Sequence, residues 1–138
     1  MSVIVWDGTT LAADSHANNG DLAFPYPKLW ALMDGRLAGA VGPLQAVAEL
    51  QQWTLNGLPK SFPTSTGTQL LIVSKEKGVV RYRNSAIPYL HGSNKLAIGE
   101  GAPFAYGALF MGATAEQAVL AAIDGSPHCN GQVISLKL

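Results

Sequence analysis

The chain has 138 residues, of which 48% are hydrophobic and 13% are charged, and its nine basic and nine acidic residues balance. This length predicts one domain spanning residues 1–138, and the apolar composition predicts either a deeply buried core or further surface covered in an oligomer. No basic patch suggests nucleic acid as a partner, and nothing suggests an anionic membrane surface.

The first predicted element is a hairpin at the start of the chain. An apolar strand follows Ser2, Asp7-Gly8 favours a type I′ turn, and a second strand over 11–13 ends at Asp14. The hairpin therefore returns Asp14 to the neighbourhood of Ser2.

The middle of the chain is predicted to alternate strands and turns around one helix. Lys28 opens a strand over 28–32, whose hairpin partner covers 36–41. Lys28 fits either an exposed lysine at a strand end or a lysine directed into a site. The other elements expected here are an irregular stretch over 15–21, a short strand over 22–24, a helix from Pro43 to about Asn56, a loop over 58–67, and hairpin strands over 68–74 and 79–83.

The last third is predicted to hold two helices between strands. Thr114 and Gln117 form a capping box at the start of the second helix, and Gly125 is its expected C-terminal stop. The remaining predicted elements are a short strand within 87–90, a strand over 96–98, a helix over 103–111, a loop over 126–131 and a strand over 132–138. Helices grouped between antiparallel hairpins predict an α+β fold with two facing sheets and helices outside them.

Compartment and chemistry follow from a few residues. One cysteine, Cys129, excludes an internal disulfide framework, and with no signal peptide or membrane span in the sequence a cytoplasmic protein is expected. If Met1 is removed, Ser2 carries a hydroxyl together with a free α-amine, whose pKa of about 7.7–8.0 leaves part of it neutral at pH 7. Such a residue can be nucleophile and base together. Serine is common at this position, however, and Asp14 fits a turn or cap equally well.

Several short motifs in register carry more information than either residue. They are Ser2-Val-Ile-Val, Ala13-Asp14, Lys28, Ala38-Gly39-Ala40-Val41-Gly42 and the segments 98–104 and 112–118. In these motifs the chain resembles the proteasome β-subunit family, and its bacterial HslV-type members in particular, which are N-terminal nucleophile (Ntn) hydrolases. The resemblance runs from residue 2 to residue 138, although 56–68 looks too short for the second helix that family members carry there.

The resemblance implies a four-layer αββα sandwich of two antiparallel sheets, here with a reduced helical layer. It also implies a peptidase that works as a ring through an acyl-enzyme. Carried over by position, Ser2 matches the nucleophilic threonine, Asp14 and Lys28 match the acidic residue and the lysine beside it, and Gly39 matches the N–H donor of the oxyanion hole.

Four further positions belong to the expected surroundings of Ser2, and three of them depart from the family pattern. Glu100, next to Gly101, stands where the family has a serine near the α-amine, and Ser126 and Cys129 replace its aspartate and second serine. The Ser2 side chain also lacks the γ-methyl group of threonine, which restricts the nucleophile's rotamer.

Electrostatics agrees with most of these roles. A cationic Lys28 would lower the pKa of the Ser2 amine, and Asp14 would offset the cost of burying that cation. A carboxylate at Glu100 would instead stabilise the protonated amine and weaken the base. Gly39 would let the backbone approach a developing oxyanion closely.

Two functions remain open: an Ntn peptidase or amidohydrolase, and a non-catalytic oligomeric protein that keeps the proteasome-like fold. The hydrolase would act on a peptide or protein as a homo-oligomer, either a ring or a smaller assembly, and the resemblance leaves room for an ATPase partner. No cofactor or metal is expected. A thiol hydrolase built from Cys129, His128 and Asp124 is a weaker reading, because adjacent residues in a loop do not automatically face each other. A metal site built from His16, Asp14 and Asp21 is also weaker, because the spacing matches no ligand motif.

Overall fold

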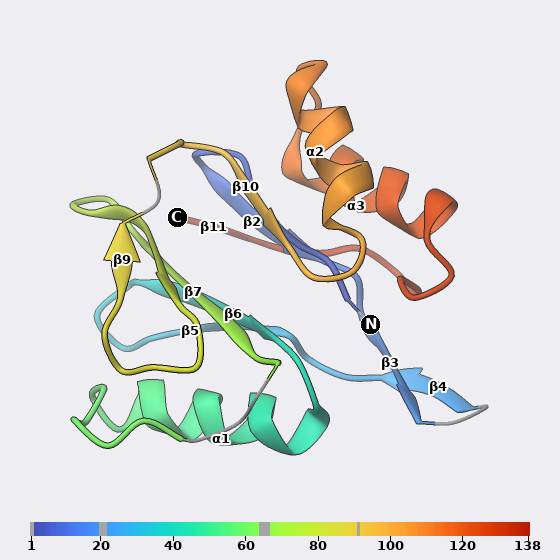
Figure 1. The fold of residues 1–138 in the computed structure, drawn as a ribbon. Helices are drawn as coiled ribbons and strands as arrows, with labels where there is room; N and C mark the ends of the chain where they lie inside the picture. The colour runs from blue at the N-terminus through green and yellow to red at the C-terminus, as the bar shows by residue number, and fades with distance from the viewer. Residues whose placement is uncertain (1, 20–21, 64–66, 91) are drawn as a thin grey trace.

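The computed structural model describes residues 2–19, 22–63, 67–90 and 92–138. Its elements stack in four layers (Figure 1). Helices α2 (Ala102–Phe110) and α3 (Ala115–Gly125) cover one sheet, a second sheet packs against the first, and helix α1 (Leu44–Leu55) covers the outer face of the second sheet. The predicted αββα sandwich is confirmed.

The sheet under α2 and α3 has four strands, and every neighbouring pair is antiparallel. The order is β10 (Leu96–Ile98), β1 (Ile4–Trp6), β2 (Thr10–Ala13) and β11 (Ile134–Lys137). Because β1 and β2 are the central strands, the start of the chain and the end of the first hairpin both lie inside the fold.

The second sheet is also antiparallel, and its five strands follow one another in chain order. They are β5 (Leu29–Ala31), β6 (Leu37–Val41), β7 (Gln69–Ser74), β8 (Gly78–Tyr82) and β9 (Tyr89–Leu90). Each is within two residues of a strand expected from the sequence, as short turns between apolar runs predict.

A separate two-stranded ribbon, β3 (His16–Asn19) and β4 (Leu22–Pro25), extends beyond the two sheets (Figure 1). The prediction of an irregular stretch over 15–21 is therefore wrong for 16–19, while Gly20 and Asp21 lie outside the described residues. The segment has no apolar alternation, so its strand character comes from pairing with β4 and not from local pattern.

Alternate residues of each strand belong to different cores. Ile4 and Trp6 face the other sheet, whereas Val3 and Val5 face α2 and α3. In the five-stranded sheet, Leu71 faces the first sheet and its neighbours on β7 face α1. Since both faces of both sheets are covered, the strands need apolar residues at nearly every position, which explains the high hydrophobic content of the chain.

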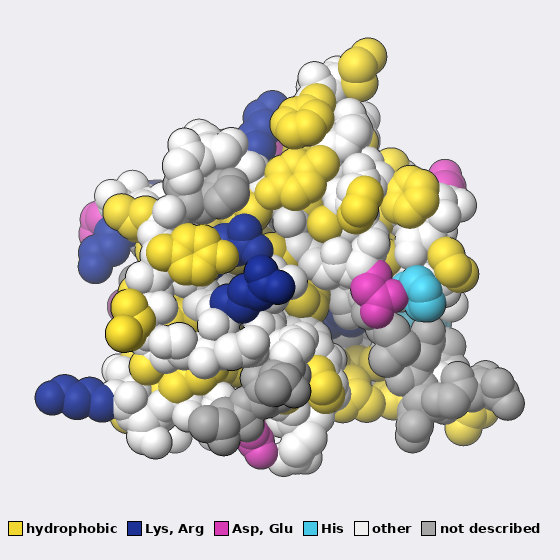
Figure 2. Space-filling view, in the orientation of Figure 1, with side chains coloured by type: hydrophobic (Ala, Val, Ile, Leu, Met, Phe, Trp, Pro, Cys, Tyr) yellow, Lys and Arg dark blue, Asp and Glu magenta, His cyan; other side chains and the backbone are white. Residues whose placement is uncertain are grey.

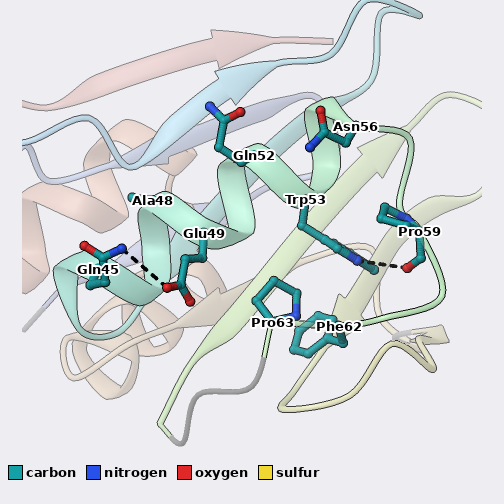
Figure 3. Close-up of a pocket in the computed structure, with 9 residues that line it drawn as sticks. All are labelled: Gln45, Ala48, Glu49, Gln52, Trp53, Asn56, Pro59, Phe62 and Pro63. Carbon is teal, nitrogen blue, oxygen red and sulfur yellow. Dashed lines mark hydrogen bonds between the residues drawn. The ribbon is translucent and has the colours of Figure 1, made fainter.

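The helical layer on the α1 side is reduced, as the sequence predicts. The described residues between α1 and β7 form no helix; instead Phe62 folds back onto Trp53, with ring centroids 4.9 Å apart, and stacks on Tyr82 at 6.4 Å. The Trp53 indole N–H donates to the Pro59 carbonyl at 2.9 Å. Figure 3 shows the open groove that this loop leaves along α1.

Three local expectations differ from the structure. Gly8 has a φ of +104° but Asp7 does not have a positive φ, so the first turn is not type I′. Instead the Asp7 carboxylate accepts hydrogen bonds from the Thr9 and Thr10 N–H groups and fixes the loop as an Asx turn. Pro43 caps α1 one residue before the helix, and Gly125 is the last helical residue of α3, with no left-handed conformation.

The capping box at Thr114 and Gln117 is present as predicted. None of the described helices is long and apolar enough to span a membrane.

Candidate active site

Asp14 is a buried carboxylate that joins three parts of the chain. It follows β2 directly and is 1% exposed. Its Oδ1 accepts a hydrogen bond from the Val3 N–H at 3.1 Å and another from the Lys28 Nζ at 2.7 Å, while its Oδ2 accepts from the Asn130 N–H at 3.0 Å. Three donors therefore satisfy the two oxygens of this buried carboxylate.

Lys28 is the cationic partner of Asp14. It precedes β5, is 5% exposed, and also donates from Nζ to the His16 carbonyl at 2.7 Å. Burial lowers the pKa of the Lys28 ammonium below its usual value, although the charge and hydrogen bond of Asp14 act in the opposite direction. The sequence left Lys28 as either an exposed or an inward-directed lysine, and the structure shows the second.

Ser2 lies directly beside this pair. It is 7% exposed, and the amide after it, that of Val3, is the one bound by Asp14. Its carbonyl accepts from the Gly101 N–H at 3.2 Å. Gly99 approaches the same carbonyl so closely that a Cβ at that position would overlap it. Backbone contacts on two sides therefore fix residue 2, while Met1 lies outside the described residues.

Gly39 lies at the same end of the site. It pairs with Leu29 across β5 and β6, and the Ala40 N–H donates to the Lys28 carbonyl at 3.1 Å. A Cβ on Gly39 would meet the Leu29 side chain at 2.7 Å and Ile4 at 3.1 Å. The close packing of β5 and β1 at this point thus requires glycine, and it brings the Gly39 backbone next to the segment that carries Lys28.

Glu100 and His128 form a pair at the surface of the site. The Glu100 Oε2 lies 3.2 Å from the His128 Nδ1, and both side chains are about half exposed. Figure 2 shows an acidic side chain and a histidine in contact on this face. The pKa of the Glu100 carboxyl lies below its usual value; the charge of His128 contributes to this shift, whereas burial opposes it.

The loop before β11 supplies the last expected residues. Ser126 is buried, and its Oγ accepts from the His128 N–H at 3.2 Å. Cys129 is buried against Gly101, where a Cβ on the glycine would lie 2.5 Å from its sulfur. Burial and the charge of Asp14 raise the pKa of the Cys129 thiol, so the thiol stays protonated at neutral pH.

This geometry counts against the two weaker readings of the sequence. The His128 Nδ1 faces Glu100, and the Cys129 thiol has a raised pKa, which is the opposite of an activated Cys–His pair. His16 contributes its carbonyl oxygen to Lys28, and Asp21 lies outside the described residues.

Sequence reasoning missed two contributors to the site. Asn130 holds Asp14 through its backbone N–H, and His16 holds Lys28 through its backbone carbonyl. Every residue except proline has both groups, so no side-chain pattern could reveal them. The pairing of His128 with Glu100 was missed for a different reason: the two residues come from separate loops that only folding brings together.

No protein-family model matches this sequence, and no curated protein sequence matches it. Among solved structures, Thiobacillus denitrificans BPH in complex with Epoxomicin is 16% identical, with a TM-score of 0.76 over 100% of this chain and 98% of that chain. HslV from Trypanosoma brucei is 19% identical, with a TM-score of 0.75 over 99% and 98% of the two chains. Anbu from Hyphomicrobium sp. strain MC1 is 12% identical, with a TM-score of 0.75 over 100% and 82%. These likenesses show that the chain has the HslV and proteasome-like Ntn fold.

Proposed function

We propose that this chain, with its HslV-like fold, is an N-terminal nucleophile peptidase or amidohydrolase that uses Ser2 after removal of Met1. One observation carries the proposal: the buried Asp14 carboxylate binds the Val3 amide and the Lys28 ammonium at once, with Oδ1 contacts of 3.1 and 2.7 Å. It thereby holds a cation beside the residue that would become the new N-terminus.

In the proposed reaction the free α-amine of Ser2 is the base. It takes the proton of the Ser2 hydroxyl as Oγ attacks the carbonyl carbon of a peptide or amide. We assign the Gly39 N–H as the donor that stabilises the developing oxyanion. The loss of one such donor typically lowers the rate by a factor of about 10²–10³. As the carbon–nitrogen bond breaks, the Ser2 ammonium returns its proton to the leaving amine, and an ester on Oγ remains.

Water completes the cycle. The same α-amine takes a proton from a water molecule as its oxygen attacks the ester carbon. The carbon–Oγ bond then breaks, the proton passes to the Ser2 oxygen, and a carboxylic acid leaves. Throughout the cycle the nearby charge of Lys28 favours the neutral, basic form of the amine.

The test is covalent labelling with mass spectrometry. Intact-mass analysis is expected to show a chain that has lost Met1, and a β-lactone or epoxyketone is expected to add one equivalent to Ser2. The Ser2→Ala variant should take up none, while Ser135→Ala, at an exposed serine on β11, should label like the wild type. A wild-type chain that loses Met1 and still takes up no probe would contradict the proposal.

The second candidate is a non-catalytic oligomeric protein with the same fold. The departures from the family pattern at Glu100, Ser126 and Cys129 favour this alternative, because a carboxylate near the α-amine of Ser2 would hold that amine in its protonated form. In either case we propose that the chain forms a homo-oligomer. The likeness to HslV supports the further proposal of an ATPase partner. Unlabelled protein with a defined oligomeric mass would support the second candidate.

A further inference from the structure

Four neighbouring strands of the second sheet bring Gly39 and an arginine into one row. The register pairs Gly39 with Leu71, Leu71 with Arg81, and Arg81 with Tyr89. Residues paired across strands lie on the same face of a sheet, and Leu71 belongs to the core between the sheets. Arg81 therefore lies on the face that carries Gly39, two strand spacings away, which is about 10 Å.

The Arg81 side chain is held in place by neutral partners. Its Nη2 donates to the Gln69 Oε1 at 2.6 Å, and its guanidinium carbon lies 5.5 Å from the centroid of the Tyr89 ring. Among residues 2–19, 22–63, 67–90 and 92–138, no carboxylate forms an ion pair with it. A guanidinium has five N–H donors in a rigid fork, so most of its binding capacity is unused.

Arg81 lies near an exposed edge of the sheet, and the described strands β7, β8 and β9 contain no acidic residue. β9 is exposed at both residues, Arg83 is exposed, and β8 contains no acidic residue. Figure 2 shows basic side chains beside an apolar side chain over this edge of the sheet, on the same face of the molecule as the acidic and histidine side chains of the Glu100 pair. The candidate site thus has a cationic group on the β8 side and an anionic one on the other.

We propose that Arg81 binds a carboxylate of the peptide substrate and makes this site selective for peptides that carry one. The carboxylate is either an acidic side chain or a free C-terminus. An extended peptide advances about 3.3 Å per residue, so the recognised carboxylate lies roughly two to four residues from the scissile bond. Guanidinium and carboxylate match in bidentate geometry. The inference rests on the proposed function, because it takes Gly39 as the point where the scissile carbonyl binds.

Binding to the Ser2→Ala chain tests the inference without requiring turnover. Fluorescence anisotropy would compare two sets of peptides. In the first set the C-terminus is amidated and one glutamate is moved along a glutamine-containing sequence. In the second set the all-glutamine peptide carries either a free or an amidated C-terminus. In one of the two sets, the peptide with the carboxylate is expected to bind roughly five- to tenfold more tightly than its neutral counterpart, as a half-exposed charge pair of this kind allows. The preference should weaken as salt is raised.

Variants at Arg81 connect the preference to this side chain. Arg81→Met should abolish the preference and leave the affinity for neutral peptides unchanged, and Arg81→Lys should keep part of it, since the charge stays but the fork is lost. Lys60→Met, which removes the same charge from an exposed loop after α1, should keep all of it. Thermal unfolding of each variant would identify any that fails to fold.

The outcomes separate this inference from the proposed function. Equal affinities in every arm, a preference that survives Arg81→Met, or no detectable peptide binding would overturn the role of Arg81. Wild-type cleavage of peptides without carboxylate selectivity would overturn it as well, while leaving the Ser2 mechanism intact. If the chain binds peptides selectively but is never labelled at Ser2, the Ser2 mechanism is overturned and the role of Arg81 in binding stands.

Discussion

Gly99 decides where Ser2 lies. Its φ of +98° and its contact with the Ser2 carbonyl leave no room for a Cβ. Gly35 has a similar φ of +90°, but nothing lies within 4 Å of its missing Cβ. The two glycines thus share a backbone conformation and differ in the close approach, which makes them a matched pair for mutation.

We expect Gly99→Ala to cost more stability than Gly35→Ala. Both variants pay about 1–2 kcal/mol for a left-handed alanine, and Gly99→Ala adds roughly 1–3 kcal/mol of overpacking against Ser2. Urea unfolding measures the difference, and the rate of probe addition to Ser2 should fall for Gly99→Ala alone. Equal stabilities would show that the carbonyl of residue 2 moves away at little cost.

Glu100 is expected to set the pH at which Ser2 works. A carboxylate near the α-amine of Ser2 would favour the protonated amine, so replacing Glu100 should lower the pKa of that amine and move the rising limb of the pH–rate profile to lower pH. Glu100→Ser should therefore raise kcat/KM at neutral pH by roughly three- to tenfold. The exposed Glu76→Ser is the control. An unchanged pH profile in Glu100→Ser would refute this role.

At the scale of elements, Asp7 connects the first hairpin to the helical layer. Its Oδ1 accepts from the Thr9 and Thr10 N–H groups, both at 2.9 Å, and its Oδ2 accepts from the Ala115 N–H, also at 2.9 Å, at the start of α3. One carboxylate thus closes the β1–β2 loop and satisfies a free donor of the helix. Partial burial raises the pKa of Asp7, but these hydrogen bonds outweigh it and the net pKa is lowered.

Asp7→Ala is expected to destabilise the fold by about 1–2 kcal/mol at pH 7, the usual cost of a lost cap. Because the folded-state pKa lies below the unfolded value, this stabilisation is present above the unfolded pKa and is lost as the pH falls through the folded value. The difference in the free energy of unfolding between the wild type and Asp7→Ala should therefore shrink below about pH 4. Urea unfolding at several pH values measures it, with the exposed Asp124→Ala on α3 as control. A stability difference that persists at low pH would show that the ionised carboxylate of Asp7 is not its source.

At the scale of the whole molecule, the α2 side of the sandwich is unusually apolar on its outside. Helix α2 has no charged residue, yet only Ala105 and Leu109 are buried. Phe110 is 81% exposed and Met111 is 89% exposed. A helix that is hydrophobic all round is normally covered, so this face supports the proposed homo-oligomer.

We expect Phe110→Glu to reduce the molecular mass in solution towards that of one chain. A charge placed in a buried apolar contact is costly to desolvate. Met33→Glu introduces the same charge at a fully exposed methionine in the β5–β6 turn and should leave the mass unchanged. Light scattering after size-exclusion chromatography measures both. An oligomer that survives Phe110→Glu would place the contact elsewhere.

The local pattern of the sequence was sufficient for most elements and for the layer order. Apolar runs separated by turn residues predicted the β5–β6 and β7–β8 hairpins, and the Thr114 capping box predicted the start of α3, because these signals act between residues close in the chain. The position of Ser2 next to Asp14 followed from the first hairpin, since its two strands have to run side by side.

Only the tertiary structure decided what surrounds those residues. The strand β3 depends on its pairing with β4, and the contacts of Asp14 with Asn130 and of Glu100 with His128 join segments that are distant in sequence. The alignment of Arg81 with Gly39 likewise depends on the register of two adjoining strand pairs. Such contacts involve backbone groups and long-range packing, which leave no periodic trace along the chain. The sequence by itself therefore determined the fold and its candidate nucleophile, and folding determined the electrostatic environment in which that nucleophile lies.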